Sequence, residues 1–161
     1  MVKNKRWVYV HEFKGLPKKS DFELREEDIP PLKDKEVLFE ALYLSVDPYM
    51  RMYVNRIGPP EYTMIGSQVA RVVESRHPEY AVGVNVVGYF GWQLFTVCDP
   101  DNITTVFGRK DKPFILPDFG DLPVSLGLGI LGMPGNTAFF GFLEICRPKA
   151  GEVVVVSGAA G

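Results

Sequence analysis

Apolar residues in the first part of the chain recur in short runs that alternate with polar residues, a pattern typical of β-strands. Glycine, proline and acidic residues bound these runs. The pattern predicts strands at residues 5–11, 22–26, 36–48 and 64–74, and two further short strands on either side of Gly91 within residues 85–98. The next stretch is rich in Asp, Pro and Gly and predicts a surface loop over residues 99–121.

The pattern changes after residue 121. Apolar positions at three- and four-residue steps predict two buried helical segments at residues 122–131 and 134–146. Residues 122–143 carry no charge, as a membrane span would, but Pro134 and five glycines interrupt them, so a break between two helices is the better interpretation. Pro134 is expected in the first turn of the second helix. Its apolar face is predicted to hold Phe139, Phe142, Leu143 and Cys146.

The chain closes on four consecutive valines at residues 153–156, followed by small residues. A β-branched run of this kind is typical of a buried parallel strand that enters a turn. Strands followed by a helix–strand unit predict two domains, residues 1–121 and residues 122–161, the second of which has only begun.

Composition indicates an ordinary globular protein, with 46% hydrophobic and 24% charged residues. The formal net charge of -2 gives no electrostatic reason to expect nucleic acid or an anionic membrane as a partner. The N-terminus becomes charged again at residues 11–12, before a signal-peptide core accumulates, so we expect a cytoplasmic location. Cys98 and Cys146 lack CxxC spacing and are expected to be reduced, buried thiols.

The stretch from Asp47 to Arg51, sequence DPYMR, allows two interpretations. Asp47 could cap a short helix that Pro48 begins. Alternatively the stretch forms a pocket wall, in which Tyr49 and Tyr53 donate hydrogen bonds while Arg51 or Arg56 meets an anionic group. The residues alone do not decide between the two.

Two glycine-containing stretches could approach a cofactor. Residues 132–138, sequence GMPGNTA, would present free amides and little bulk to a flat ring, or would simply start a helix. Residues 157–161, sequence SGAAG, could begin a phosphate-binding turn, although the third glycine of the dinucleotide fingerprint is not in view. A plain tight turn is the alternative.

Five stretches, taken in order, resemble the medium-chain dehydrogenase/reductase superfamily, and within it the zinc-free leukotriene hydroxydehydrogenase/prostaglandin reductase branch: LYLSVDPYMR, GSQVARVVES, VGYFGWQ, GMPGNTAFFGFLEI and VVVVSGAAG. The resemblance covers essentially the whole chain. It implies a β-rich, GroES-like catalytic domain at residues 1–121, followed by the first helix and strand of an NAD(P)-binding Rossmann domain at residues 122–161. An active cleft would lie between the two.

The departures from the wider superfamily concern metal binding. Zinc alcohol dehydrogenases place a Cys just after the strand corresponding to Ala41–Val46 and a Gly-His-Glu at the position of residues 66–68. At these two sites this chain has Ser45-Val46 and Gly66-Ser67-Gln68. His11 and His77 lie elsewhere in the sequence. A catalytic zinc needs three protein ligands, so no metal site is expected.

The resemblance implies NADPH-dependent reduction of the carbon–carbon double bond of α,β-unsaturated ketones and aldehydes, of the 15-oxo-prostaglandin 13-reductase or 2-alkenal reductase type. Hydride would reach the β-carbon while hydroxyl groups hold the enolate oxygen. The implied substrate-binding residues are Pro48, Tyr49, Met50, Arg51, Tyr53, Arg56 and Trp92. The implied cofactor-binding residues are Met133, Gly135, Thr137, Ser157, Gly158, Ala159, Ala160 and Gly161. The main catalytic tyrosine of the family would lie beyond Gly161.

The resemblance also bears on partners. Small enones or enals, lipid-derived ones among them, are the expected substrates, and a homodimer is expected of the full-length protein. We expect this chain to be a truncated form of a longer enzyme and to be inactive alone. Two alternatives stay open: a zinc-free quinone reductase or alcohol dehydrogenase of the same fold, and a non-catalytic binding or structural protein that reuses the barrel.

Overall fold

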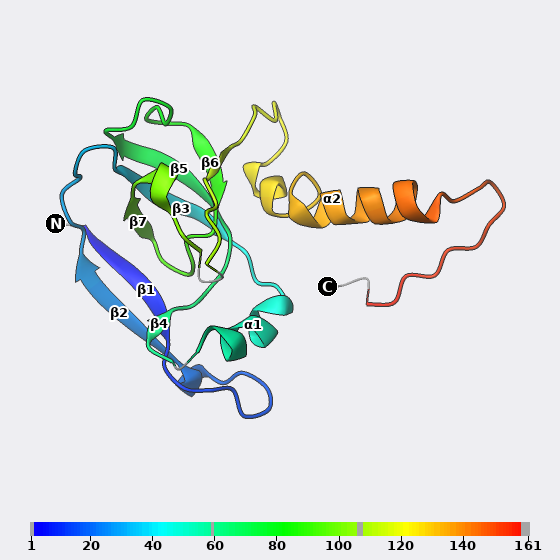
Figure 1. The fold of residues 1–161 in the computed structure, drawn as a ribbon, viewed down its shortest axis with the longest axis horizontal. Coiled ribbons are helices and arrows are strands. Elements are labelled where there is room, and N and C mark those ends of the chain that lie inside the picture. The colour runs from blue at the N-terminus through cyan, green and yellow to red at the C-terminus, as the bar shows by residue number, and fades with distance from the viewer. Residues whose placement is uncertain (1, 59, 106–107, 159–161) are drawn as a thin grey trace.

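The computed structural model describes residues 2–58, 60–105 and 108–158, in which a β-sheet body carries a projecting helical arm (Figure 1). Every strand pairing in the body is antiparallel. The strands are β1 (Lys3–Tyr9), β2 (Phe22–Asp28), β3 (Val37–Leu44), β4 (Tyr62–Thr63), β5 (Gln68–Ser75), β6 (Asn85–Gly88), β7 (Phe95–Cys98) and β8 (Phe114–Ile115).

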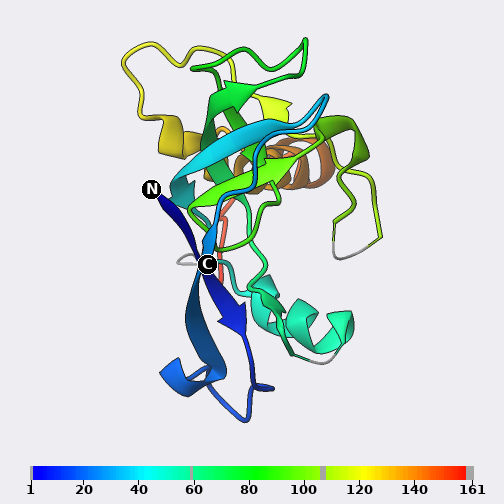
Figure 2. The same cartoon turned by 90° about the vertical axis from the view of Figure 1, so that its left-hand side faces the viewer.

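These strands form two sheets, one in the order β2-β1-β4 and one in the order β7-β3-β5-β6-β8. Figure 2 shows the long β1–β2 ribbon descending from the larger sheet. Backbone hydrogen bonds join the sheets: the Trp7 amide donates to the Trp92 carbonyl at 2.9 Å, and the Leu94 amide donates to the Lys5 carbonyl at 2.9 Å. These bonds tie β1 of the smaller sheet to the connection that leads into β7 of the larger sheet.

The core lies where alternate residues of the strands point to the same face of the sheet. Val37 and Phe39 of β3 share such a face, and neither side chain has any exposed surface. One cluster fills the larger sheet and contains Val37, Phe39, Ala70, Val72, Tyr80, Val86 and Phe90. A second cluster joins β1 to helix α1 (Tyr49–Ile57) and contains Tyr9, Met50, Val54, Met64 and Ile65.

The β-rich character of residues 1–121 is confirmed, and all six strands expected there form. The third ends at Leu44 rather than at residue 48, and the fourth begins at Gln68 rather than at residue 64. Pattern reading missed β4 and β8 because each has only two residues. The predicted loop also contains a 3-10 turn at Pro100–Asn102.

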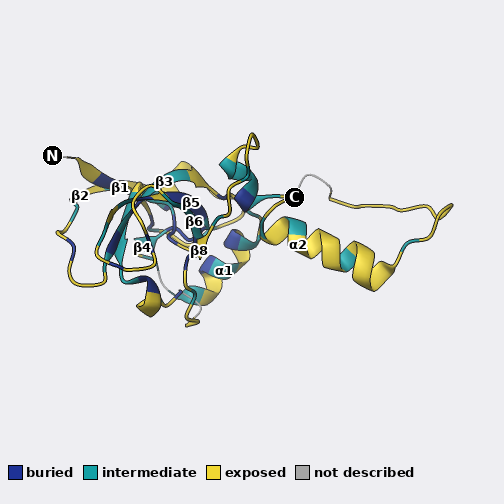
Figure 3. Ribbon diagram, turned by 90° about the horizontal axis from the view of Figure 1, so that it is seen from above, coloured by how far each residue is buried: buried dark blue, intermediate teal, exposed yellow. Residues whose placement is uncertain are grey.

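The helical arm forms where it was expected but is not buried. A 3-10 helix, Val124–Leu128, precedes α2 (Met133–Phe139), which has Pro134 in its first turn and continues as a π-helix over Phe140–Cys146. The predicted burial is wrong: Phe139, Phe142 and Leu143 are 51%, 41% and 46% exposed (Figure 3). No helix in the described part of the chain is long and apolar enough to cross a membrane.

The predicted strand at residues 153–156 is also wrong. These four valines run as extended chain beneath α2 in Figure 1, and their exposures range from 51% to 90%. A parallel strand needs neighbouring strands on which to form its ladder. None of the eight strands that the structure describes lies in a sheet with this segment.

The two cysteines are free thiols but differ in environment, so only part of the sequence expectation holds. Cys98 packs against the first core cluster, where burial and then the carboxylates of Asp99 and Glu36 raise the pKa of its thiol to about 12. Cys146 is exposed at the end of the π-helix, contrary to the expectation of burial.

We expect iodoacetamide to alkylate Cys146 readily at pH 8 and to leave Cys98 unmodified in the folded chain, because thiolate is the reactive form. Peptide mass mapping after timed quenching measures both rates, with the urea-unfolded chain as the control in which both react. Equal rates in the folded chain would contradict this placement of Cys98.

Candidate active site

The strand-to-helix connection after β3 builds one wall of the site. Ser45 is fixed against Ser67, since its amide donates to the Ser67 carbonyl at 2.8 Å and its Oγ accepts from the Ser67 amide at 3.0 Å. Pro48 is the N-cap of α1, and the Asp47 side chain makes no cap hydrogen bond; instead the Asp47 carbonyl accepts from the Met50 amide at 3.1 Å. The capping role considered for Asp47 is therefore wrong, while the expected short helix does form, with Pro48 as its N-cap and Tyr49 as its first residue.

Three adjoining hollows lie between α1, the loop after β6 and the start of α2. The largest, of about 480 Å³, is lined by Tyr49, Tyr53, Tyr89, Thr105, Arg109, Lys110, Asp111 and Met133. A more apolar cavity of about 190 Å³ shares Tyr49, Tyr89 and Thr105 with it. A third, of about 160 Å³, shares Tyr89, Asp111 and Met133 and reaches Ser45, Asp47 and Ser67. We call the 480 Å³ space the central hollow.

Tyr49 is the most distinctive side chain of the central hollow. Its Oη is buried and has no hydrogen-bond partner of normal geometry among the described residues, although the nearby Ser67 hydroxyl slightly favours its ionised form. Burial, followed by the negative potential of Tyr89 and Asp47, raises the pKa of Tyr49 to about 12. The phenol therefore keeps its proton at neutral pH and is an unused donor.

Of the other predicted substrate residues at α1, Tyr53 lines the central hollow and Arg56 contacts Tyr53, whereas Pro48 and Arg51 lie away from the hollow. Tyr53 lines the central hollow beside Tyr49, with ring centroids 5.4 Å apart, and the Arg56 guanidinium lies 5.6 Å from the Tyr53 ring centroid. Pro48 is exposed at the start of α1. The Arg51 guanidinium donates to the Gly15 carbonyl at 2.6 Å, so it is directed at the loop after β1.

Met50 and Trp92 lie in the wall behind the cavities. Met50 belongs to the second core cluster, and the Trp92 indole packs against that cluster and donates to the Ser45 carbonyl at 3.1 Å. A Cβ at Gly66, which lines the 190 Å³ cavity, would approach Met50 Cε and Trp92 Nε1 to 2.9 Å. These two side chains therefore support the wall from its inner side.

The predicted cofactor residues lie on two sides of the start of α2. Met133 faces the central hollow, whereas Gly135, Thr137 and Ser157 line a groove of about 1300 Å³ between the helical arm and residues 152–157. Gly158 follows in a turn, at φ +69°. Ala159, Ala160 and Gly161 lie outside the described residues.

Gly135 has a clear packing reason. A Cβ there would overlap the Ile130 carbonyl oxygen, so no other residue fits this first turn of α2. The Thr137 hydroxyl donates to the Met133 carbonyl at 2.9 Å, which holds the turn closed. The small residues of the GMPGNTA stretch thus position Met133 against the central hollow.

At the positions where zinc alcohol dehydrogenases carry metal ligands, this chain uses its side chains for internal hydrogen bonds. Ser45 and Ser67 bond to each other as described above. The buried Gln68 amide donates to the carbonyls of Gly91 and, at 3.0 Å, Gln93. The Gln68 side chain thus ties β5 to the connection between β6 and β7.

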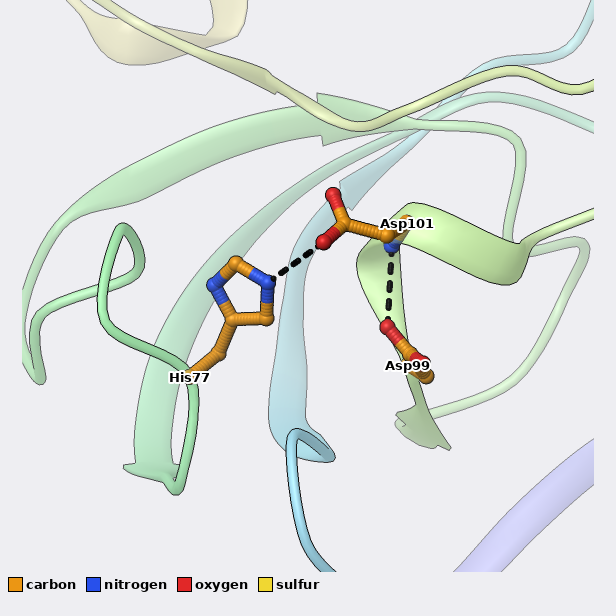
Figure 4. A group of neighbouring side chains, drawn as sticks. All are labelled: His77, Asp99 and Asp101. Atoms are coloured by element: carbon orange, nitrogen blue, oxygen red, sulfur yellow. Dashed lines mark hydrogen bonds and ion pairs between the residues drawn. The ribbon is translucent and has the colours of Figure 1, made fainter.

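One group of potential metal ligands lies elsewhere: His77, Asp99 and Asp101 offer atoms within 4.8 Å of one another (Figure 4). His77 Nε2 bonds to Asp101 Oδ2 at 3.1 Å, and its Nδ1 accepts from the Glu79 amide at 3.2 Å. Lys112 Nζ lies 2.7 Å from Asp101 Oδ1. These contacts occupy the ligand atoms of His77 and Asp101, so the group is a structural ion-pair cluster.

Sequence reasoning missed five residues of the central hollow: Tyr89, Thr105, Arg109, Lys110 and Asp111. Tyr89 lies within the VGYFGWQ stretch, where an aromatic residue flanked by Gly88 and Phe90 at the end of a strand was a usable signal. The other four belong to the stretch interpreted as a plain surface loop, whose composition carries no sign of a site.

A comparison with family models decides the affiliation. Residues 5–106, more than half of the chain, match the family described as the N-terminal domain of oxidoreductase. The chain belongs to this oxidoreductase family.

Similar proteins refine the assignment. Rabbit (Oryctolagus cuniculus) prostaglandin reductase 1 is 46% identical over 162 residues, covering 100% of this chain and 44% of that protein. The NADP⁺-dependent 2-alkenal reductase of Nicotiana tabacum is 38% identical over 170 residues, covering 99% of this chain and 47% of that protein. The crystal structure of CurA in complex with NADPH from Vibrio vulnificus superposes with a TM-score of 0.78 at 34% identity, over 98% of this chain and 45% of that one.

These similarities confirm the zinc-free prostaglandin reductase branch and the GroES-like barrel that the motifs predicted. The chain matches the N-terminal half of the proteins in this branch. It spans about half the length of the curated relatives it matches.

Proposed function

We propose that this oxidoreductase chain provides the substrate-binding half of an NADPH-dependent reductase of α,β-unsaturated ketones and aldehydes. The observation that carries the proposal is the unpaired, buried hydroxyl of Tyr49 in a hollow that Met133 also lines. The names of the similar proteins, a prostaglandin reductase and a 2-alkenal reductase, supply the reaction class.

The chain's own residues would act on the substrate oxygen. As hydride adds to the β-carbon of an enone, negative charge develops on the carbonyl oxygen, and a donor directed at that oxygen lowers the barrier. Tyr49 is such a donor because its Oη has no bond to give up, and its pKa of about 12 keeps the proton on the phenol. Tyr53 is the neighbouring phenol at the same hollow.

NADPH, when bound, supplies the hydride. We assign Met133, on the side of α2 that faces the central hollow, to the nicotinamide end. Gly135, Thr137 and Ser157, which share the groove on the other side of α2, are assigned to the rest of the cofactor, with Gly158 and the residues after it near its phosphates. Two observations support this assignment: Met133 and Gly135, which line the hollow and the groove respectively, both lie in the first turn of α2, and the similar CurA forms a complex with NADPH.

We also propose a domain division, a cellular location and an oligomeric state. Residues 1–121 would be the catalytic domain and residues 122–161 the start of the Rossmann domain. The proposed location is cytoplasmic, from the charged N-terminal sequence, and the proposed oligomeric state is a homodimer of the full-length protein, from the family resemblance. The alternatives are a zinc-free quinone reductase or alcohol dehydrogenase and a non-catalytic barrel protein, and turnover of enones, quinones and alcohols compared side by side separates them.

We expect the 161-residue chain alone to oxidise no NADPH in the presence of an enone. The physical reason is that the groove that would receive the cofactor is open along the exposed valines of residues 153–156. A chimeric reductase, in which this chain replaces the matching residues of rabbit prostaglandin reductase 1, is expected to reduce the enone. Loss of nicotinamide absorbance measures both.

Robust turnover by the chain alone would contradict this prediction. A chimeric reductase that binds NADPH, measured by nicotinamide fluorescence, but reduces no enone or enal would contradict the proposed function itself.

A further inference from the structure

Two cationic side chains that line the central hollow, Arg109 and Lys110, have no role in the function proposed above. Arg109 and Lys110 share this space with the unpaired Tyr49 hydroxyl. The ion pairs among the described residues use neither of them. Adjacent cations on a cavity wall that also holds an unused donor form a ready receptor for an anion.

Backbone hydrogen bonds hold the two residues that carry these cations. The Arg109 carbonyl accepts from the Thr105 amide at 2.8 Å and from the Thr105 hydroxyl at 3.2 Å. Thr104 and Lys110 pair across an antiparallel bridge. Thr105 is buried and lines both the central hollow and the 190 Å³ cavity, so its bonds to Arg109 attach the cations to the wall of the site.

The charges that face the hollow are unequal. Asp111 is its only lining carboxylate among the described residues, against two lining cations, while the Arg56 guanidinium lies over the ring of Tyr53. Asp47 and Lys112 line the adjoining 160 Å³ space, but Lys112 is already paired with Glu79 and Asp101. The central hollow therefore has an excess of positive charge.

The remaining wall is apolar. Ile65 and Phe90 line the 190 Å³ cavity that joins the hollow at Tyr49 and Tyr89. A ligand that fits all three environments has an apolar chain, an oxygen for Tyr49 and an anionic group for the cations. Among the substrates of the proposed function, on which this inference rests, that description fits an enone that carries a carboxylate.

We propose that Arg109 and Lys110 bind the carboxylate of the substrate and thereby select unsaturated oxo-acids over neutral enones. The pair determines specificity and takes no part in the hydride step.

Octanoate tests the proposal, because it has the apolar chain and the carboxylate but no double bond to reduce. By titration calorimetry on the 161-residue chain, we expect octanoate to bind about tenfold more tightly than octan-1-ol. The double variant Arg109→Gln/Lys110→Gln should lose this preference. Lys18→Gln/Lys19→Gln, which removes the same charge from two adjacent exposed lysines, should keep it. The reversal Arg109→Glu/Lys110→Glu should prefer octylamine.

The cofactor is the other source of an anion, and adenosine 2′,5′-bisphosphate is the probe for its phosphates. Binding of this nucleotide that depends on Arg109 and Lys110, with octanoate unaffected, would overturn the proposal. So would equal losses of octanoate binding in the two Gln variants, or no binding of octanoate by the unaltered chain. Since octanoate is not reduced, these results do not depend on whether the proposed reductase activity is found.

Discussion

Replacement of Phe39 by Ala is expected to destabilise the chain by about 3–5 kcal/mol, the range for loss of a buried aromatic side chain. Phe39 has no exposed surface, and its ring stacks on Phe90 at a centroid distance of 4.8 Å and meets Tyr80 edge-on at 5.9 Å. Its removal leaves a cavity at the centre of the larger sheet, between β3 and the strands on either side. Urea unfolding followed by circular dichroism measures the change.

Phe114→Ala is the matched control, because Phe114 is 65% exposed in the short edge strand β8. We expect its effect to stay within about 0.5 kcal/mol, as for surface substitutions generally. Similar losses in the two variants would mean that the first core cluster does not carry the stability of the barrel.

Tyr49→Phe is expected to lower kcat of the chimeric reductase about 100-fold, the lower end of the range for one lost oxyanion donor. The substitution removes only the hydroxyl, which has no partner of normal geometry in the described structure, so the fold should lose little stability. Because the pKa of Tyr49 is about 12, its neutral form persists from pH 7 to about pH 11, and its loss of a proton should not limit turnover over that range.

Tyr80→Phe separates catalysis from stability. The Tyr80 hydroxyl is committed to the Pro113 carbonyl at 2.7 Å inside the core, so this variant should lose about 1 kcal/mol of stability and keep its kcat. Stopped assays with NADPH and an enone, run beside urea unfolding, give both quantities. Unchanged kcat in Tyr49→Phe would remove Tyr49 from the proposed mechanism.

Strand positions could be predicted from the sequence because the signal is local. The alternation that buries Val37 and Phe39 follows from the two-residue period of a strand. The two-residue strands β4 and β8 have no period to read and exist through their partners β1 and β6.

The exposure of the helical arm and of residues 153–156 could not be predicted from the sequence. Whether an apolar face is buried depends on which other surface packs against it, and local periodicity does not record that. The apolar periodicity of the arm was interpreted correctly as a helix and wrongly as a buried one. The lining of the central hollow could likewise be predicted only in part. Tyr49, Tyr53 and Met133 could be found from motifs. Thr105, Arg109, Lys110 and Asp111 reach the hollow through backbone pairing, such as the bridge between Thr104 and Lys110, that no local pattern encodes.

The Gln68 side chain has a practical consequence. It joins β5 to the backbone on either side of Trp92 through an uncharged amide, which neither gains nor loses a proton in the range where carboxylates and imidazoles titrate. This tie beside the site therefore holds in mild acid and in the presence of chelating agents. Rate changes across that range can then be assigned to the reacting groups rather than to loosening of this part of the barrel.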